Sequence, residues 1–195
     1  SNFLTIFIGL ILFLFAYSYT GGPKPYGYNG LGELGVILVF GPMTVLGSLH
    51  IFNIDLTLNF LLISLIPGIS ASLIILINNI RDIQNDEIGG KNTIAVILGG
   101  KKSRYLYFLL IILIIILLLL VSYLFKNNYI YITAILAYVI FPLDELGFSS
   151  LKMKSLLPKF DIKNSKKSSE LNTTLIKTVA GHFILCITIS AALLI

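Results

Sequence analysis

Tryptophan is absent from this chain, and cysteine, histidine and charged side chains are scarce. Because Cys186 is the only cysteine, the chain has no internal disulfide and no zinc site built on clustered cysteines. The sequence has no Ser/His/Asp arrangement and no P-loop, so the corresponding hydrolytic and nucleotide-binding chemistries lack support. Charged residues make up 12% of the 195 residues and hydrophobic residues 56%, with a mean hydropathy of +0.94. This balance excludes an ordinary soluble domain.

The chain consists largely of long apolar runs. Six runs are long enough to cross or nearly cross a bilayer, at roughly 2–19, 34–52, 56–80, 105–125, 129–149 and 176–195. They predict an all-α fold, a polytopic transmembrane helical bundle that forms a single domain over residues 1–195.

The basic residues predict how this bundle is oriented. Of the 14 Lys and Arg residues, only Lys126 falls on one side, and the others lie in or next to the connections 20–33, 81–104 and 150–175. The positive-inside rule makes these three connections cytoplasmic. The net charge of +5 then reports topology and attraction to anionic lipid of the bilayer. We expect no nucleic acid partner, because no basic patch lies on a soluble domain.

The most informative segment is 78–86, which ends the third apolar run. Asp82 and Asp86 are four residues apart and share one face if the helix continues. Two such carboxylates beside water suit Mg²⁺, which prefers one or two carboxylates together with substrate phosphates. Asn78 and Asn79 lie near the bilayer boundary, where polar groups are costly and usually functional. The alternative is that the two acids merely end a transmembrane helix.

Basic and aromatic residues around this segment suit a diphosphate substrate. Arg81, Lys91 and Arg104 are candidates to contact diphosphate oxygens, as a fork or as point charges. Tyrosine rings facing the same side are candidates to stabilise a carbocation, although anchoring at the membrane interface explains each of them equally well. These tyrosines are Tyr17, Tyr19, Tyr26 and Tyr28.

Several residues are unusual inside or beside an apolar run. Gly41-Pro42 and Pro67-Gly68 predict kinks or points of close helix packing. Residues 30–35 formally match the GxGxxG pattern, but they precede a membrane span and no βαβ unit surrounds them, so we interpret them as a turn and a packing point. For His50 and His182 we expect packing or hydrogen bonding.

Two separate motifs, in this order along the chain, resemble a known family. Residues 78–86, with Gly90-Lys91-Asn92-Thr93 and Ala95-Val96-Ile97-Leu98-Gly99 after them, resemble the second Asp-rich motif of UbiA-type membrane prenyltransferases. Upstream, the segments 19–25 (Tyr-Thr-Gly-Gly-Pro-Lys-Pro), 27–28, 30–33 and 40–42 are similar to the 1,4-dihydroxy-2-naphthoate prenyltransferases of menaquinone synthesis. The resemblance is strong from 17 to 105 and weaker beyond.

The resemblance implies where this chain lies within such an enzyme. The six runs correspond to the last six of the family's nine transmembrane helices, and the family's first Asp-rich motif would precede residue 1. We therefore expect the C-terminal two thirds of a prenyltransferase, which by itself lacks half of the metal site. The segments 20–33 and 81–104 would be cytoplasmic active-site loops, and 150–175 a basic cytoplasmic loop, in a bacterial cytoplasmic (inner) membrane.

The resemblance also implies a reaction and roles for the candidate residues. A polyprenyl group would pass from polyprenyl diphosphate to 1,4-dihydroxy-2-naphthoate, with loss of CO₂, giving demethylmenaquinone. The expected catalytic residues are Asp82, Asp86, Arg81 and Tyr19, with Mg²⁺ on Asp82 and Asp86. The expected substrate-binding residues are Asn78, Asn79, Lys91, Arg104, Lys24 and Tyr28, with Arg81 or Lys24 orienting the naphthoate carboxylate.

Three alternatives stay open at this point. The chain could prenylate another aromatic acceptor, such as 4-hydroxybenzoate or homogentisate. It could be a lipid phosphotransferase, although such enzymes have a denser acidic motif. It could be a membrane transporter, although transporters place ionisable residues near the bilayer midplane rather than at one edge.

Overall fold

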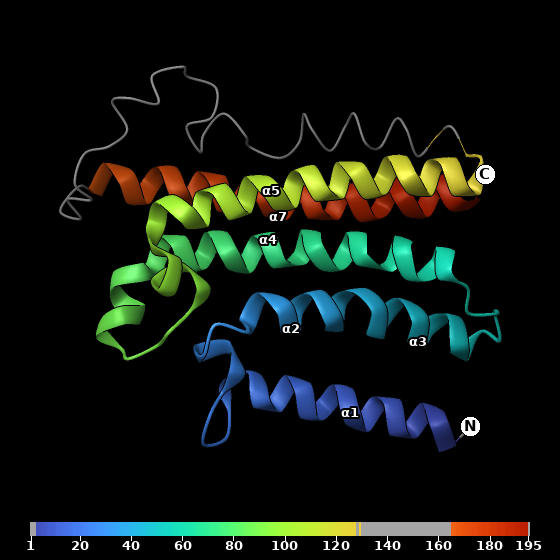
Figure 1. Ribbon diagram of the computed structural model, residues 1–195, viewed down its shortest axis with the longest axis horizontal. Helices are drawn as coiled ribbons and strands as arrows, with labels where there is room; N and C mark the ends of the chain where they lie inside the picture. Colours follow the sequence, from blue (N-terminus) through green and yellow to red (C-terminus); the bar gives the residue numbers. More distant parts are fainter. Residues whose placement is uncertain (1–2, 128, 130–164, 195) are drawn as a thin grey trace.

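The computed structural model describes residues 3–127, 129 and 165–194. All regular secondary structure in this part of the chain is helical (Figure 1). The elements are α1 (Phe3–Thr20), the short 3-10 turn η1 (Tyr26–Tyr28), α2 (Gly32–Leu38), the π-helical turn η2 (Val39–Met43), α3 (Thr44–Ile51), α4 (Leu58–Ile88), α5 (Ile94–Phe125) and α7 (Ser165–Leu194). The predicted all-α class is confirmed.

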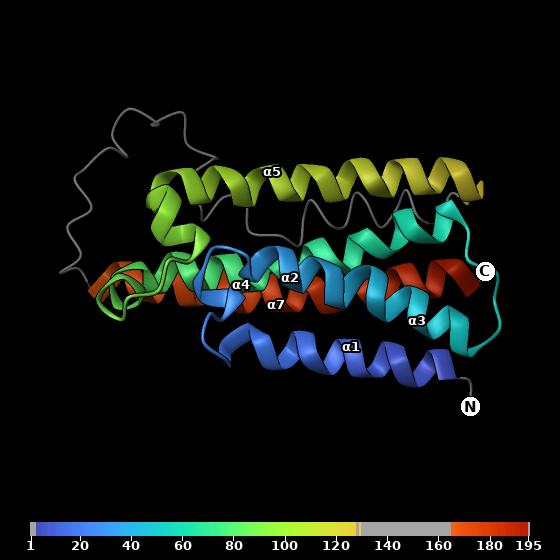
Figure 2. The same ribbon diagram turned by 60° about the horizontal axis from the view of Figure 1, so that its bottom comes forward.

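The long helices lie side by side along one axis, in layers. Helix α4 is central and packs against α5, α7 and α2, while α1 covers the far side of α2 and α3 (Figures 1 and 2). The core is apolar and comes from α4, α5 and α7. Its fully buried members include Ile66, Leu73, Leu76, Ile77, Ile80, Tyr107, Ile111, Ile114, Leu118 and Leu185. Large apolar side chains such as Leu109 and Phe183 are exposed, as expected of a surface that faces lipid.

Four of the described helices are long and apolar enough to cross a membrane. They are Gly32–Ile51, Leu58–Ile88, Ile94–Phe125 and Leu171–Leu193, and Thr5–Thr20 is a shorter apolar helix. These five correspond to the first four predicted runs and the last one. The predicted run 129–149 and most of the basic connection 150–175 lie outside the described residues.

Some of the predicted connections are helical instead. Helix α4 continues through the Asp-rich segment to Ile88, and α5 begins at Ile94, so only a short turn remains of the loop predicted at 81–104. The segment 81–88 contains no helix breaker; the helix stops at Gly89 and Gly90, where Gly90 has φ +71°. The Thr93 hydroxyl then accepts the Val96 N–H and caps α5. Likewise α7 begins at Ser165, within the predicted loop 150–175.

Glycine allows the closest helix approach in the bundle. Gly41 leaves the helical region, with φ −100° and ψ −106°, and this break before Pro42 separates α2 from α3 as predicted. Gly68 faces Gly41, and a Cβ atom on Gly68 would overlap the carbonyl oxygen of Ile37. Helix α4 itself stays continuous at Pro67, so this pair is a packing point and not a break.

Polar groups also join the helices inside the bundle. The ring nitrogen Nδ1 of His182 on α7 hydrogen-bonds the Ser70 hydroxyl on α4, which confirms the expectation of a hydrogen-bonded histidine. The Tyr107 hydroxyl lies 2.7 Å from the Thr178 hydroxyl and links α5 to α7. Such pairs satisfy groups that lipid cannot.

Candidate active site

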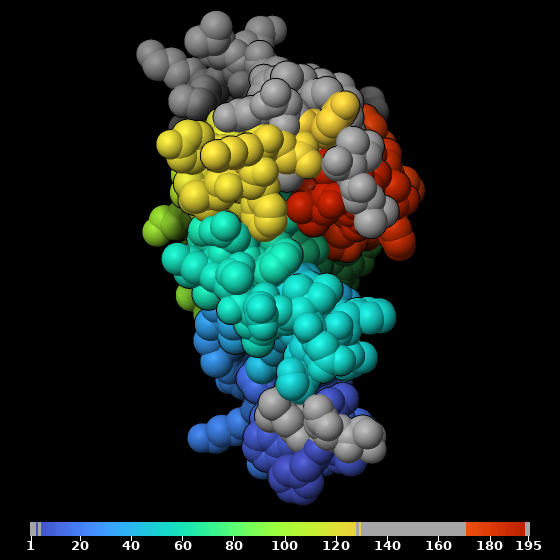
Figure 3. All heavy atoms as spheres, turned by 90° about the vertical axis from the view of Figure 1, so that its right-hand side faces the viewer, coloured from blue at the N-terminus to red at the C-terminus, as the bar shows by residue number. Residues whose placement is uncertain are grey.

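The polar residues predicted to be functional gather at one end of the bundle. Here α1 ends, α2 begins, α4 turns into α5, and α7 begins, at the left in Figure 1. Figure 3 shows the opposite end, where α5, α7, the α3–α4 connection and α1 form a stack. The bundle therefore presents its Asp-rich motif at one edge rather than in its middle.

Arg81 is the centre of the first cluster. Its Nε donates to Oδ1 of Asp82 at 2.8 Å and its Nη2 to Oδ2 at 2.7 Å, a forked pair that only a guanidinium makes. Nη2 also donates to Oδ1 of Asn78 at 2.6 Å, and Nη1 to Oδ1 of Asn172 on α7 at 3.2 Å. The arginine is thus held in one orientation by residues of two helices.

Lys91 and Asp86 form the second cluster. The Lys91 ammonium lies 3.0 Å from Oδ1 of Asp86 and 4.9 Å from the centre of the Tyr28 ring. The hydrogen bond to Asp86 raises the pKa of Lys91 above its ordinary value. The N–H of Asn92 donates to the carbonyl of Tyr28 at 2.8 Å, which ties the α4–α5 turn to the connection after α1.

Glu33 and Asn79 form a third, more buried pair. The Glu33 side chain, in the first turn of α2, is 3% exposed, and its Oε1 accepts from Nδ2 of Asn79 at 2.9 Å. Its Oε2 is shielded and has no hydrogen-bond partner among the described residues. We did not predict Glu33 as a site residue. The available signal was an acid at the start of an apolar run, where burial of a charge is costly.

Aromatic rings line the same end next to Glu33. Tyr19 packs edge-on against Tyr26 with ring centres 5.4 Å apart, and Tyr26 lies 6.0 Å from Phe15. The Tyr19 hydroxyl lies over Gly32, since a Cβ there would be 3.6 Å from it. Tyr17, in contrast, is 61% exposed and faces outward.

Two further predicted residues lie on the connection after α1 and on α5. Lys24 is exposed on the connection between α1 and α2. Arg104 is half-buried on α5, beyond the break at Gly99. Substrate binding by these two residues stays a prediction. Asn172, which accepts a hydrogen bond from Arg81, was not among the predicted site residues.

The cluster supplies two carboxylates of the kind that bind a hard cation. No group of three or more His, Cys, Asp or Glu side chains able to hold a metal ion occurs in the part of the chain that the structure describes. Asp82 and Asp86 each face a cation of the chain itself, Arg81 and Lys91. Their charge is therefore already balanced internally.

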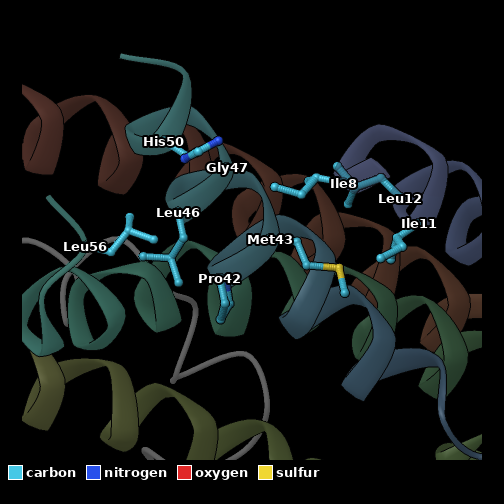
Figure 4. Close-up of a pocket in the computed structure, with 9 residues that line it drawn as sticks. All are labelled: Ile8, Ile11, Leu12, Pro42, Met43, Leu46, Gly47, His50 and Leu56. Atoms are coloured by element: carbon cyan, nitrogen blue, oxygen red, sulfur yellow. The ribbon is translucent and has the colours of Figure 1, made fainter. Parts of the chain in front are cut away.

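An apolar cavity of about 300 Å³ lies between α1 and α3, toward the other end of the bundle (Figure 4). Its lining comes from Ile8, Ile11, Leu12, Pro42, Met43, Leu46, Gly47, His50 and Leu56. Its position and its nearly apolar lining separate it from the acidic and basic residues of the edge.

Fold and edge together define a class: a polytopic helical membrane protein with paired acids and cations at one membrane face. The chain belongs to the UbiA prenyltransferase family, whose family model matches residues 1–145. The resemblance found in the two motifs is thereby confirmed.

The chain is also similar in sequence to individual members of this family. The chain is 40% identical to 1,4-dihydroxy-2-naphthoate octaprenyltransferase of Haemophilus influenzae over 97 residues, which is 50% of this chain and 32% of the relative. It is 39% identical to the protein of the same name of Bacillus subtilis over 101 residues, 52% of this chain and 32% of the relative. It is 34% identical to 2-carboxy-1,4-naphthoquinone phytyltransferase of Synechocystis over 94 residues, which is 48% of this chain and 30% of the relative.

These matches span about a third of the length of the curated relatives. No solved structure matches the chain.

Proposed function

We propose that this chain acts in an enzyme that transfers a polyprenyl group from its diphosphate to 1,4-dihydroxy-2-naphthoate at the cytoplasmic face of a bacterial inner membrane. The observation that carries this proposal is the pair of acid–base clusters, Arg81–Asp82 and Lys91–Asp86, at one edge of an apolar bundle. Such an edge suits a substrate with an anionic head and a hydrocarbon tail. The relatives are named for naphthoate or naphthoquinone acceptors, which supports the choice of acceptor.

A divalent cation fits the donor set at this edge once the two carboxylates part from Arg81 and Lys91, which hold them in this structure. Mg²⁺ is usually held by one or two carboxylates together with phosphate oxygens and water, and Asp82 and Asp86 would be those carboxylates. When bound, the ion would supply neutralisation of charge on the departing diphosphate.

Arg81 and Lys91 would bind the diphosphate oxygens. Arg81 is oriented by Asn78 and Asn172, and its fork, which holds Asp82 in this structure, would turn to a phosphate oxygen where the diphosphate displaces that carboxylate. Lys91 sits between Asp86 and the Tyr28 ring, so it can exchange the carboxylate for a phosphate oxygen by a side-chain rotation. Positive charge held in place where negative charge develops lowers the barrier to departure of the leaving group.

The aromatic rings of Tyr19 and Tyr28 would face the allylic carbon as positive charge develops there. In the reaction the carbon–oxygen bond to diphosphate breaks, and a carbon–carbon bond forms at the ring carbon that carries the carboxylate. That carboxylate leaves as CO₂, and its bonding electrons restore the aromatic ring. The product is the quinol form of demethylmenaquinone, so no oxidant is needed.

A transfer assay in membranes tests the proposal. Polyprenyl diphosphate and Mg²⁺ are supplied with one of three acceptors, namely 1,4-dihydroxy-2-naphthoate, 4-hydroxybenzoate or homogentisate. The samples are this chain, a version extended by the coding sequence upstream of it, and the extended version carrying D82A and D86A. We expect the extended version to use the naphthoate, and the double substitution to lower the rate by at least about a hundredfold.

Other outcomes would change the proposed acceptor or the proposed class of protein. Transfer to another acceptor would overturn the choice of naphthoate. Absence of transfer in a folded extended protein, with uptake of the acceptor into sealed vesicles, would favour a transporter. Metal-dependent transfer by this chain without the extension would show that it holds a complete metal site.

A further inference from the structure

The carboxyl group of Glu33 has no part in the reaction described so far, although it lies beside the site. Its Oε1 is occupied by Asn79, while its Oε2 is buried and has no partner among the described residues. A buried polar oxygen without a hydrogen bond is unfavourable, and such groups persist mainly where function retains them. Oε2 is therefore an acceptor position that stands open for a donor.

The surroundings of Glu33 indicate the kind of donor. The Tyr19 hydroxyl lies over Gly32, next to Glu33, and Tyr19, Tyr26 and Phe15 form an edge-to-face group. Such rings pack well against another flat aromatic ring. A phenolic hydroxyl on that ring would bring the hydrogen-bond donor that Oε2 lacks.

The distribution of charge separates two ends of the site. Glu33 is paired with a neutral amide, whereas the cations Arg81 and Lys91 lie at Asp82 and Asp86. A ring that carries both a hydroxyl and a carboxylate would turn its hydroxyl toward Glu33 and its carboxylate toward a cation. The reverse orientation would bring two carboxylates together.

We propose that Oε2 of Glu33 accepts a hydrogen bond from a ring hydroxyl of the aromatic acceptor and so selects hydroxyl-bearing acceptors; this rests on the proposed function. Because Oε2 is shielded, the acceptor reaches it only when a neighbouring segment moves, and the connection 21–31, whose Gly27 packs against Gly32, adjoins Glu33. That connection is held to the α4–α5 turn by the Asn92–Tyr28 backbone bond and the Lys91–Tyr28 contact, both of which a loop displacement breaks.

Glutamine at position 33 separates this role from a purely structural one. In E33Q the amide oxygen still accepts from Asn79, so the position of Asn79 is kept. The amide NH₂ then replaces Oε2, and a donor stands where the acceptor was. A ring hydroxyl can then only accept from this NH₂, so the charge-assisted bond that it would donate to the carboxylate is lost, whereas support of Asn79 is not affected.

The test compares E33Q with the wild type in the full-length protein in membranes. We expect KM for 1,4-dihydroxy-2-naphthoate to rise about tenfold to a hundredfold, with KM for polyprenyl diphosphate unchanged. The matched control is E87Q, because Glu87 is an exposed acid on the same helix as the Asp-rich motif. The two mono-methoxy analogues of the acceptor, each lacking one donor, are assayed in parallel. The wild type should discriminate against one of them and E33Q should not.

Each outcome decides between the two claims. Transfer by the wild type with an unchanged acceptor KM in E33Q overturns the role of Glu33 and leaves the proposed function standing. No transfer by the wild type overturns the proposed function, and the role of Glu33 with it. If E33Q fails to accumulate in the membrane, equal KM values of the wild type for the acceptor and both analogues overturn the role.

Discussion

Arg81 shows how one side chain organises the edge of this membrane protein. Its guanidinium donates two parallel hydrogen bonds to Asp82 and, at the same time, one each to Asn78 and Asn172. A lysine ammonium is a point charge and cannot keep these bonds together in one plane. The orientation of the cation, and not its charge alone, is what the cluster provides.

The substitution R81K keeps the charge and removes the fork. We expect the catalytic efficiency with polyprenyl diphosphate to fall about tenfold to a hundredfold, because the cation is no longer held toward the leaving group. The measurement is steady-state transfer at varied polyprenyl diphosphate concentration. The matched control is K101R, the opposite exchange at an exposed position on α5, which should leave the kinetics unchanged. Equal kinetics for R81K and the wild type would exclude a directional role for Arg81.

At this scale the sequence led to the residues of the Asp-rich segment but not to their partners. Asp82, Asp86, Asn78 and Lys91 lie within one short stretch, so their proximity follows from local chain geometry. Glu33 lies 46 residues before its partner Asn79, and Asn172 lies 91 residues after its partner Arg81. Contacts over such separations depend on how helices pack, and a single sequence does not report that packing.

Among the elements, the crossing of α2 and α4 depends on glycine. Gly68 approaches the backbone at Ile37 so closely that a methyl group has no space, and the obstacle is a carbonyl oxygen and not a flexible side chain. This crossing places Glu33 of α2 against Asn79 of α4. A packing position in the membrane interior thereby controls the geometry at the edge.

We expect G68A to lower the free energy of unfolding by about 1–3 kcal/mol, because the added methyl group forces the two helices apart. Thermal unfolding in detergent measures this change. The control is G47A, where the nearest atom to a new Cβ is Ile8 Cγ2 at 3.9 Å and no strain is expected. A melting temperature for G68A equal to that of G47A would show that the crossing relaxes at no cost.

Element boundaries were the least predictable part of the fold. The apolar runs located the helices, because burial in lipid requires continuous apolar sequence. Helices α4 and α7 nevertheless extend past their apolar runs, because no helix breaker interrupts 81–88 and because a helix continues into water where its polar residues allow it. Hydropathy reports where a membrane is crossed and not where a helix stops.

For the whole molecule, the charge distribution and the position of the site agree. The basic connections after α1 and after α4 lie at the same end as the Arg81 and Lys91 clusters. We therefore expect this end to face the cytoplasm, as the positive-inside rule requires.

Cysteine labelling tests this orientation. The single native cysteine is first replaced (C186A), and K102C or N53C is then introduced at the exposed ends of the bundle. We expect a membrane-impermeant maleimide to label K102C only in inverted membrane vesicles. It should label N53C only in spheroplasts, as the positive-inside rule requires. The reverse pattern would place the clusters outside and contradict the proposed function.

The sequence by itself determined that this is a helical membrane protein, which connections carry most of the positive charge, and which segment carries the acids. Each of these depends on composition or on residues that are near neighbours along the chain. Only the tertiary structure decided that Arg81 is held by Asn172, that Glu33 is buried against Asn79 with one oxygen open, and that Gly68 sets the crossing of α2 and α4. These depend on how helices distant in sequence pack, which local physical rules leave open.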